Sequence, residues 1–432
     1  MPGRTVMSAV KWLYPGMRVK RWLLLVPVGM AFVVAGVILL ANWRLDVALN
    51  HFGAWIFQQT GVDISSPKWM IPIGLGLMGV GLILTFSALR QVVRSITSVV
   101  SPEAQGKLAD VIFQRRYLSQ GQRIVVIGGG TGLSTMLRGL KQFSSNLVAI
   151  VTVTDDGGSS GRLQREMGVM PPGDIRNCLV AMADAEPLMT ELFQYRFKEN
   201  IEGLDGHTFG NLLIAAMTRI TGDFERAVRE TSNILAIRGL VLPSTIDDVR
   251  LQAELEDGSF VEGETNIVHN PKAIRHIMLH PSTVKPLEEA LRSIELADCI
   301  VLGPGSIYTS IVPNLLVHGI PEAIERSPAV KAFVCNVMTQ PGETDDYTAS
   351  DHIAALLKHT EARIFHYAIV NTARPSSQML EKYEHEHQRF VEPDVHRIRD
   401  LGFRPLTGDF ISQTEVVRHD PGKLAQAILK LL

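Results

Sequence analysis

The chain has 432 residues, with 42 lysines and arginines against 44 aspartates and glutamates and a formal net charge of −2. This balance, with no long basic stripe outside the flanks of two apolar segments, argues against a nucleic-acid-binding protein. The three cysteines, Cys178, Cys299 and Cys335, lie in apolar surroundings without metal-type spacing. We expect them to be reduced core residues.

Two segments near the N-terminus are apolar enough to span a membrane. Residues 22–43 and 69–89 contain no charged side chain, and each can cross a bilayer core of roughly 30 Å as a helix. A cleaved signal peptide would have a shorter apolar region and a small-residue cleavage site. A buried core helix would be weakened by the glycines at residues 74–81. We therefore expect residues 1–94 to form an anchor of two transmembrane helices.

The basic residues predict the orientation of this anchor. Lysines and arginines cluster before the first segment and again over residues 90–116, whereas the loop between the segments holds only Arg44 and Lys68. By the positive-inside rule both termini and the large C-terminal part face the cytoplasm, joined by a short external loop. The sequence thus predicts a multi-pass protein of the cell membrane.

A linker over residues 95–120 is expected to follow the anchor. Ala104, Leu108, Val111 and Ile112 recur at helical spacing after a Ser-Pro pair, which predicts a juxtamembrane amphipathic helix. Its role is either that of a spacer or that of a regulatory element. Residues 121–432 are long enough for one substantial domain.

In that domain, short β-rich runs alternate with helical patterns. The predicted strands are residues 123–127, 147–154, 298–302, 330–337 and 363–370, with a helix over 133–143. This alternation predicts an α/β fold with a Rossmann-like, doubly wound, mostly parallel sheet. Residues 249–268 alternate around Asp257-Gly258 and predict an antiparallel hairpin, and residues 179–237 are expected to be largely helical. These two stretches are interpreted as additions to the sheet.

A glycine-rich loop ends the first predicted strand. Residues 128–132 read Gly-Gly-Gly-Thr-Gly and open a helix, which places free backbone N–H groups where a phosphate binds. The loop does not fit the dinucleotide fingerprint, because position 133 is leucine, and it lacks the lysine of a Walker A motif. It therefore predicts a phosphate-bearing ligand without identifying it.

An acid pair, Asp155 and Asp156, ends the second predicted strand. The pair is consistent with three roles. It holds Mg²⁺ against a diphosphate, it accepts hydroxyl protons from a ribose, or it caps a helix.

Further polar loops follow other predicted strands. Gly-Pro-Gly-Ser at residues 303–306 precedes Thr309 and Ser310, and a polar loop covers residues 336–345. Because ligands of an open parallel sheet bind outside the carboxyl ends of its strands, these loops together predict one nucleotide or polyphosphate site.

Two polar clusters lie between the strands. In residues 172–177, Asp174 is a candidate helix cap and Arg176 a candidate phosphate ligand; in residues 207–211, Asn211 is either a cap or a ligand contact. We find no nucleophile elbow, no zinc spacing and no serine or cysteine with an obvious base. Covalent catalysis is therefore not expected.

The order of these motifs resembles the CofD/YvcK family. Gly-Gly-Gly-Thr-Gly, Asp-Asp-Gly-Gly-Ser-Ser-Gly-Arg, Pro-Gly-Asp-Ile-Arg-Asn, His-Thr-Phe-Gly-Asn and Gly-Pro-Gly-Ser follow one another from residue 128 to residue 306. CofD-type members are Mg²⁺-dependent transferases that move a phospholactyl-type group from a nucleoside-diphosphate donor onto a deazaflavin alcohol. YvcK-type members, the gluconeogenesis factors, bind UDP-sugars and support cell shape and envelope synthesis. Residues 336–347 and 417–420 are similar to the second branch.

The resemblance implies a UDP-N-acetylglucosamine-like ligand and a regulatory rather than catalytic protein. It implies that a ligand-binding tyrosine and arginine fall on Tyr347 and Arg418. The full set of expected ligand-binding residues is Gly129, Gly130, Thr131, Gly132, Ser159, Arg176, Asn177, Asn211, Gly303, Gly305, Ser306, Tyr347 and Arg418. No cofactor is required for binding, and Mg²⁺ on Asp155 and Asp156 is the alternative for a transferase. Expected partners are an envelope-precursor or carbon-metabolism protein and a second copy of the chain.

Overall fold

The structure is a computed structural model that describes residues 20–40, 54–55, 57–59, 67–100, 116–184, 187–198, 203–360, 363–412 and 416–432. The chain divides into two compact units, Met1–Arg115 and Arg116–Leu432, and each is described by itself. The amphipathic helix expected at residues 104–112 lies outside the described residues.

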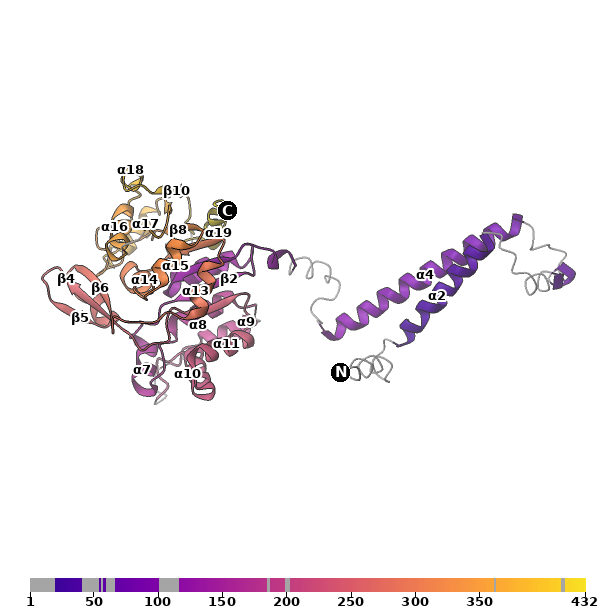
Figure 1. The fold of residues 1–432 in the computed structure, drawn as a ribbon, viewed down its shortest axis with the longest axis horizontal. Helices are drawn as coiled ribbons and strands as arrows, with labels where there is room; N and C mark the ends of the chain where they lie inside the picture. Colours follow the sequence, from indigo (N-terminus) through magenta and orange to yellow (C-terminus); the bar gives the residue numbers. More distant parts are fainter. Residues whose placement is uncertain are drawn as a thin grey trace. The chain divides into compact units, whose positions relative to one another are not determined.

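The first unit contains two long helices, α2 (Lys20–Leu40) and α4 (Pro67–Val100), which pack against each other (Figure 1). Glycines allow their close approach: a Cβ atom on Gly29 would lie 2.4 Å from Oγ1 of Thr85, and one on Gly81 would lie 2.6 Å from the carbonyl oxygen of Gly29. This packing through small residues is typical of membrane helices.

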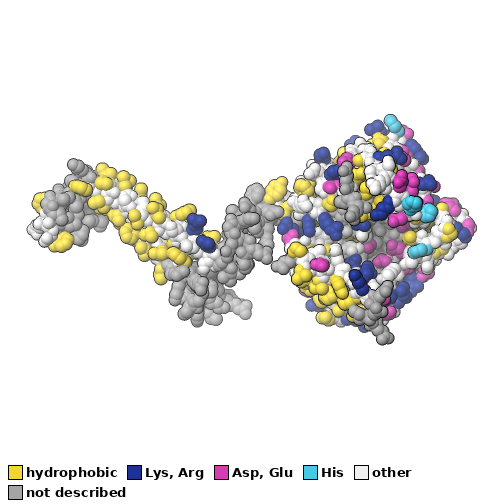
Figure 2. Space-filling view, turned by 180° about the vertical axis from the view of Figure 1, so that it is seen from behind, with side chains coloured by type: hydrophobic (Ala, Val, Ile, Leu, Met, Phe, Trp, Pro, Cys, Tyr) yellow, Lys and Arg dark blue, Asp and Glu magenta, His cyan; other side chains and the backbone are white. Residues whose placement is uncertain are grey.

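Both helices are long and apolar enough to cross a membrane. The candidate spans are Trp22–Leu40, with a mean hydropathy of 2.8, and Ile71–Ser95, with a mean hydropathy of 1.9. At 1.5 Å per residue the shorter span covers about 28 Å, close to the thickness of a bilayer core. Large apolar side chains such as Ile83 and Phe86 are 67% and 72% exposed, and Figure 2 shows hydrophobic side chains along the surface of these helices. The helix α4 continues to Val100, beyond the expected end of the span at residue 89.

The second unit is built on a seven-stranded parallel sheet with the order β10-β9-β8-β7-β1-β2-β3. The strands are β1 (Ile124–Gly128), β2 (Leu147–Val151), β3 (Leu240–Pro243), β7 (Cys299–Leu302), β8 (Val330–Val334), β9 (Tyr367–Asn371) and β10 (Arg404–Gly408). From β1 the chain adds β2 and β3 on one side, and β7 to β10 on the other. The doubly wound α/β fold predicted from the sequence is therefore confirmed.

Alternation along β1 shows why the sheet is buried on both faces. Val125 and Ile127 belong to one apolar cluster, whereas Ile124 and Val126 belong to another. Helices cover both faces (Figure 1). Apart from α12, which is described below, the helices of this unit are α6 (Gly130–Leu140), α7 (Gly158–Met167), α8 (Gly173–Met182), α9 (Pro187–Gln194), α10 (Phe209–Thr221), α11 (Phe224–Ile234), α13 (Glu288–Glu295), the π-helix η2 (Ile307–Ile311), α14 (Val312–Leu315), α15 (Ile320–Arg326), α16 (Ala349–His359), α17 (Ser377–Glu384), α18 (Val395–Asp400) and α19 (Pro421–Leu429).

A second sheet is inserted between β3 and β7. It contains β4 (Arg250–Leu255), β5 (Phe260–Glu262) and β6 (Ile274–His280), with antiparallel pairs β4–β5 and β4–β6. The expected hairpin over residues 249–268 is correct only as far as Glu262. Residues beyond it form the helix α12 (Glu264–Val268), and the third strand β6 pairs with the other edge of β4. The alternation in residues 264–268 was too short to distinguish a strand from one helical turn.

The cysteine expectation is also confirmed. Cys178, Cys299 and Cys335 are free and buried, and burial raises the pKa of all three thiols.

Candidate functional site

The candidate site lies where the sheet changes its winding direction. Strand β1 pairs with β2 on one side and with β7 on the other, and the chain leaves these strands toward opposite sides of the sheet. The loops after β1 and β7 therefore diverge at the carboxyl edge and leave a crevice, which is where doubly wound sheets bind their ligands. Those two loops are the glycine-rich loop at 128–132 and the loop at 303–306.

Glycine is required in both loops because they touch each other. A Cβ atom on Gly132 would lie 2.5 Å from the carbonyl oxygen of Pro304, and one on Gly129 would lie 2.5 Å from Oδ2 of Asp174. Gly130 and Gly303 have positive φ angles of 67° and 76°, a region that favours glycine. The N-cap residue of α6, Gly129, has no side chain to cap the helix, and the N–H group of Gly130 is bonded to the carboxylate of Asp174. The N–H groups of Thr131 and Gly132, which line the crevice, are therefore the donors of this first turn that remain for an anion.

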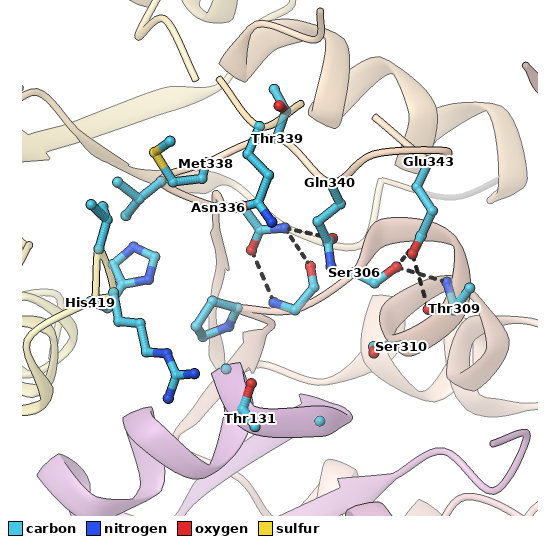
Figure 3. Close-up of a pocket in the computed structure, with 18 of the residues that line it drawn as sticks. Thr131, Ser306, Thr309, Ser310, Asn336, Met338, Thr339, Gln340, Glu343 and His419 are labelled. Atoms are coloured by element: carbon cyan, nitrogen blue, oxygen red, sulfur yellow. Dashed lines mark hydrogen bonds between the residues drawn. The ribbon is translucent and has the colours of Figure 1, made fainter. Parts of the chain in front are cut away.

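The loop after β7 is held by the loop after β8. The N–H group of Gly305 donates to Oδ1 of Asn336 at 3.1 Å, and Nδ2 of Asn336 donates back to the carbonyl oxygen of Gly305 at 2.8 Å (Figure 3). Ser306 caps η2 by accepting the N–H of Thr309 at 3.1 Å, and its hydroxyl donates to the carboxylate of Glu343. These bonds fix the backbone of the second loop before any ligand binds.

Together the loops line a cleft of about 610 Å³, within the usual size range of small-molecule sites. Of the residues expected from the sequence, the structure brings Gly129, Gly130, Thr131, Gly132, Gly305, Ser306 and Arg418 into its lining. Gly303 directly follows the last residue of β7 and does not line the cleft, whereas its neighbour Pro304 does. The cleft thus combines the phosphate-type loops with an arginine from near the C-terminus.

The C-terminal wall of the cleft comes from the segment before α19. Backbone hydrogen bonds from Ser412 to Arg418, at 2.9 Å, and from Asp420 to Phe410, at 2.7 Å, hold this segment. The Asp420 side chain then caps α19. The guanidinium of Arg418 is exposed and forms no ion pair with any residue that the structure describes. It is available to a ligand phosphate, which arginine binds with two parallel hydrogen bonds.

Two glutamates in the lining, the buried Glu343 and the half-buried Glu264, have raised pKa values. Burial raises the pKa of Glu343 to about 7, despite hydrogen bonds from Ser306 and Thr309 that favour its charged form. Burial, followed by the charges of Asp155 and Asp174, raises the pKa of Glu264 well above its usual value. Such shifts concentrate at functional sites.

Asp155 and Asp156 have separate environments. The carboxylate of Asp156 accepts the N–H and hydroxyl of Thr265, in the first turn of α12, at 2.9 and 2.7 Å. The helix that directly follows the acid pair, α7, has no side-chain cap. Asp155 accepts the N–H of Gly157 at 2.9 Å, and burial raises its pKa. Neither carboxylate lines the cleft. Asp155 instead lies close enough to Asp174 for its charge to raise the pKa of Asp174.

Asp174 was expected to cap a helix, and this expectation is wrong. The N-cap of α8 is Pro172, and Asp174 is the second residue of the helix. Its carboxylate accepts the N–H of Gly130 instead, and burial, followed by the charge of Asp155, raises its pKa to about 7. Asp174 therefore holds the backbone of the glycine-rich loop through the N–H group of Gly130.

Ser159, Arg176, Asn177 and Asn211 form a second polar cluster outside the cleft lining. Nη1 of Arg176 donates to Oδ1 of Asn211 at 3.2 Å, and Nη2 donates to Oδ1 of Asn177 at 2.7 Å. Nδ2 of Asn211 donates to the hydroxyl of Ser159 at 3.1 Å. The four residues are brought together, but with one another rather than with the cleft.

This cluster corrects one expectation from the sequence. The hydroxyl of Ser159 lies 2.8 Å from Nδ1 of His207, so a serine with a basic partner is present. Both residues are buried, at 6% and 2% exposure, and burial lowers the pKa of His207. The pair was missed because its members are 48 residues apart in the chain.

Tyr347 is also placed away from the cleft lining. Its hydroxyl lies 2.8 Å from that of Tyr308, and it lines a neighbouring pocket with Arg374 and Arg389. The tyrosine in the wall of the cleft is Tyr383 of α17, whose hydroxyl accepts the N–H of Val417 at 2.9 Å. Sequence analysis missed Tyr383, Glu264 and His419 as lining residues. A tyrosine within a helical pattern carries no local signal of this kind.

Comparisons with known proteins identify the family of this chain. The profile of the family described as "2-phospho-L-lactate transferase CofD" matches residues 124–411. A putative gluconeogenesis factor from Nostoc sp. is 47% identical over 97% of this chain and 92% of its own length. The gluconeogenesis factor of Bacillus subtilis is 46% identical over 73% of this chain and 99% of its own length.

A solved structure extends the comparison to the fold. A crystal structure of a protein from Bacillus halodurans superposes with a TM-score of 0.70 at 49% identity, covering 72% of this chain and 99% of that one. The Nostoc alignment continues through the N-terminal segment, whereas the Bacillus proteins correspond to the part that contains the sheet. This chain therefore belongs to the CofD/YvcK family and groups within it with the gluconeogenesis factors.

Proposed function

We propose that this chain binds a UDP-sugar, of the UDP-N-acetylglucosamine type, in the cleft between the glycine-rich loop and the loop at 303–306. One observation carries the proposal: two phosphate-type loops, the exposed cation Arg418 and the ring of Tyr383 line the same cleft. Free N–H groups and a guanidinium suit a diphosphate, and an aromatic ring suits a planar base or a sugar face.

Titration calorimetry tests the proposal directly. The full chain in detergent micelles is titrated with UDP-N-acetylglucosamine, and saturable binding of one ligand per chain is expected. Absence of saturation at millimolar ligand would remove the proposal. Inorganic diphosphate serves as a control for the phosphate contacts alone.

We further propose that Met1–Arg115 anchors the protein in the cell membrane, with both termini and the large domain in the cytoplasm. The exposed apolar side chains of α2 and α4 and the basic residues that flank them support this orientation. Alkaline carbonate extraction should leave the protein in the membrane pellet. Protease added to intact spheroplasts should leave the large domain uncut, and its digestion would reverse the proposed topology.

The bound UDP-sugar is proposed to act as a signal rather than as a substrate. In this account the ligand state changes contact with an envelope-precursor or carbon-metabolism protein and so links carbon metabolism to envelope synthesis and cell shape. Complementation of a strain that lacks the protein tests this role: the wild-type chain should restore cell shape on gluconeogenic carbon sources, and Arg418→Ala should not. A homo-oligomer is proposed as well, and light scattering of the purified chain measures its mass.

A Mg²⁺-dependent transferase is the second candidate, favoured by the carboxyl groups beside the glycine loop. Within the described residues no group of three or more histidine, cysteine or acidic side chains is preassembled for a metal. Mg²⁺ is nevertheless often held by one or two carboxylates plus substrate phosphates. Of the pair expected from the sequence, Asp156 is engaged by Thr265. Asp155 and Asp174, which lies beside Gly129 of the glycine-rich loop, are then the two carboxylates for the metal, whose charge would offset the effect of their burial.

In this second candidate the metal would neutralise charge on the donor diphosphate. The glycine loop would hold and orient that diphosphate through its N–H groups. The matching assay follows release of a nucleoside monophosphate. Release that depends on both a deazaflavin alcohol and Mg²⁺ would establish the transferase and displace the purely regulatory role.

A further inference from the structure

One side of the cleft comes from the inserted segment between β3 and β7. Helix α12, which follows β5, contributes Glu264 to the cleft lining. The first turn of α12 is held to the loop after β2, because Asp156 accepts the N–H and hydroxyl of Thr265. The other end of α12 lies against the loop after β8, where a Cβ atom on Gly342 would overlap the carbonyl oxygen of Val268. The helix therefore reaches from one cleft loop to another.

This side of the cleft is acidic, and one of its two acids has no partner. Glu343 is buried and engaged, since its carboxylate accepts the hydroxyl of Ser306. Glu264 is half-buried, and its carboxyl group forms no hydrogen bond or ion pair with any residue that the structure describes. Its oxygens retain accessible surface. Glu264 therefore keeps its acceptors for a ligand in the cleft.

The opposite side of the cleft is different. It is formed by α17 and the segment before α19 and carries the cation Arg418, whereas its acid, Glu386, is exposed to solvent. Figure 3 shows His419 of this side and Glu343 of the acidic side, with Thr131 of the glycine-rich loop between them. A diphosphate on that loop would therefore have a cationic side and an acidic side, and the acidic side receives another part of the ligand.

Hydrogen-bond donors decide which part of a UDP-sugar suits Glu264. A carboxyl group accepts hydrogen bonds in either protonation state. The uracil ring offers a single N–H donor between carbonyl acceptors, whereas a hexose carries several hydroxyl donors. After burial, the charges of Asp155 and Asp174 raise the pKa of Glu264, so negative charge from the loops behind reaches this side. A ligand group that is itself an acid is disfavoured there.

We propose that the sugar of the bound UDP-sugar lies against α12, that Glu264 accepts hydrogen bonds from its hydroxyl groups, and that this side excludes uronic acids. The inference rests on the proposed UDP-sugar function and adds which part of the ligand the inserted segment contacts. Glu264 is then a specificity-determining residue. It distinguishes a neutral hexose from the hexose whose C6 group is a carboxylate.

Three ligands test the assignment. The full chain in detergent micelles is titrated with UDP, with UDP-N-acetylglucosamine and with the uronic acid of the latter, UDP-N-acetylglucosaminuronate. EDTA is present, so that no divalent cation bridges the diphosphate and the acids. The two sugar nucleotides differ only at C6. We expect the wild type to bind UDP-N-acetylglucosamine at least about tenfold more tightly than the uronic acid, because like charges are brought together only by the latter.

Two variants of Glu264 separate its hydrogen bond from its acidity. Glu264→Ala removes the acceptor and should lower the affinity for UDP-N-acetylglucosamine relative to UDP by about tenfold, the worth of one hydrogen bond to a carboxyl group. Glu264→Gln keeps an acceptor and removes the acid. It should therefore retain most of the affinity for UDP-N-acetylglucosamine and reduce the preference over the uronic acid, and it replaces the alanine variant if that one does not fold.

Glu262→Ala is the matched control. Glu262 is an exposed acid of β5, two positions from Glu264 and outside the cleft lining. Its replacement should leave all three affinities unchanged.

The outcomes separate this inference from the proposed function. If Glu264→Ala changes the affinities for UDP and UDP-N-acetylglucosamine by the same factor, as a contact to the ribose would, the assignment of the sugar is overturned and the UDP-sugar site stands. Equal wild-type affinity for UDP-N-acetylglucosamine and its uronic acid overturns the exclusion. A wild-type chain that binds none of the three ligands overturns both proposals.

Discussion

Replacement of Gly132 by alanine tests whether contact between the two phosphate-type loops is needed for the site. The added Cβ atom would lie 2.5 Å from the carbonyl oxygen and 2.9 Å from the carbonyl carbon of Pro304. Both are backbone atoms, so no flexible side chain can move aside to relieve the overlap. Overpacking of this kind costs about 1–3 kcal/mol, which exceeds the gain of at most about 1 kcal/mol from alanine in a helix.

We therefore expect Gly132→Ala to lower the melting temperature by several degrees and to weaken UDP-sugar binding by about tenfold or more, since 1.4 kcal/mol of strain in the bound state corresponds to one decade. Thermal unfolding and titration calorimetry on the full chain measure both effects. Gly128→Ala is the matched control, because its Cβ atom would meet nothing closer than a Leu133 methyl group at 3.6 Å. Equal stability and affinity for Gly132→Ala and the wild type would refute the proposed role of loop contact.

Three other predictions follow from the site. Arg418→Ala should weaken binding of UDP-N-acetylglucosamine by about tenfold or more, because a charge-assisted hydrogen bond is lost. Arg374→Ala should leave the affinity unchanged, because Arg374 lies outside the cleft lining. Calorimetry at two salt concentrations compares the two variants. Burial raises the pKa of Glu343 from 4.5 to about 7. Between these pH values the folded state keeps a proton that the unfolded state loses, so the free energy of unfolding falls as pH rises. Glu343→Gln should reduce that fall in denaturant titrations at several pH values, and an unchanged pH profile would contradict the shift. Ser159→Ala breaks the bonds to Asn211 and His207 and should cost about 1–3 kcal/mol of stability without changing ligand affinity; reduced affinity with normal stability would place Ser159 in the ligand site.

The sequence predicted the sheet because its strands carry strong local signals. The β-branched run before Gly128 is buried on both faces, as a central parallel strand has to be, and it ends in glycines that only a close loop contact explains. Strand ends are local in sequence, so the loops at 128–132 and 303–306 were identified as parts of one site. Their position at the edge of the sheet follows from the winding order, which the alternation of strands and helices implies.

Other parts of the site depend on contacts between distant segments. Tyr383 reaches the cleft because α17 packs on the segment before α19, and a sequence pattern gives no indication of that packing. His207 meets Ser159 for the same reason, through the approach of the residues before α10 to the start of α7. Asp174 was expected to cap its own helix, but the folded chain offers it the N–H of Gly130, 44 positions away in the sequence. Such partners are set by tertiary structure, which local propensity does not encode.

The two apolar N-terminal helices show the reverse case. Residues 22–43 and 69–89 were identified from the absence of charge alone, and α2 and α4 cover most of both segments. The sequence did not indicate that Gly29 and Gly81 face each other, because the rotation of one helix against another depends on packing along the whole pair.

A crystal structure of the chain bound to UDP-N-acetylglucosamine is the most direct test of the central claim. The account predicts the diphosphate on the N–H groups of the glycine-rich loop with Arg418 beside it. A ligand bound outside the cleft, or a diphosphate held without the glycine-rich loop, would contradict it.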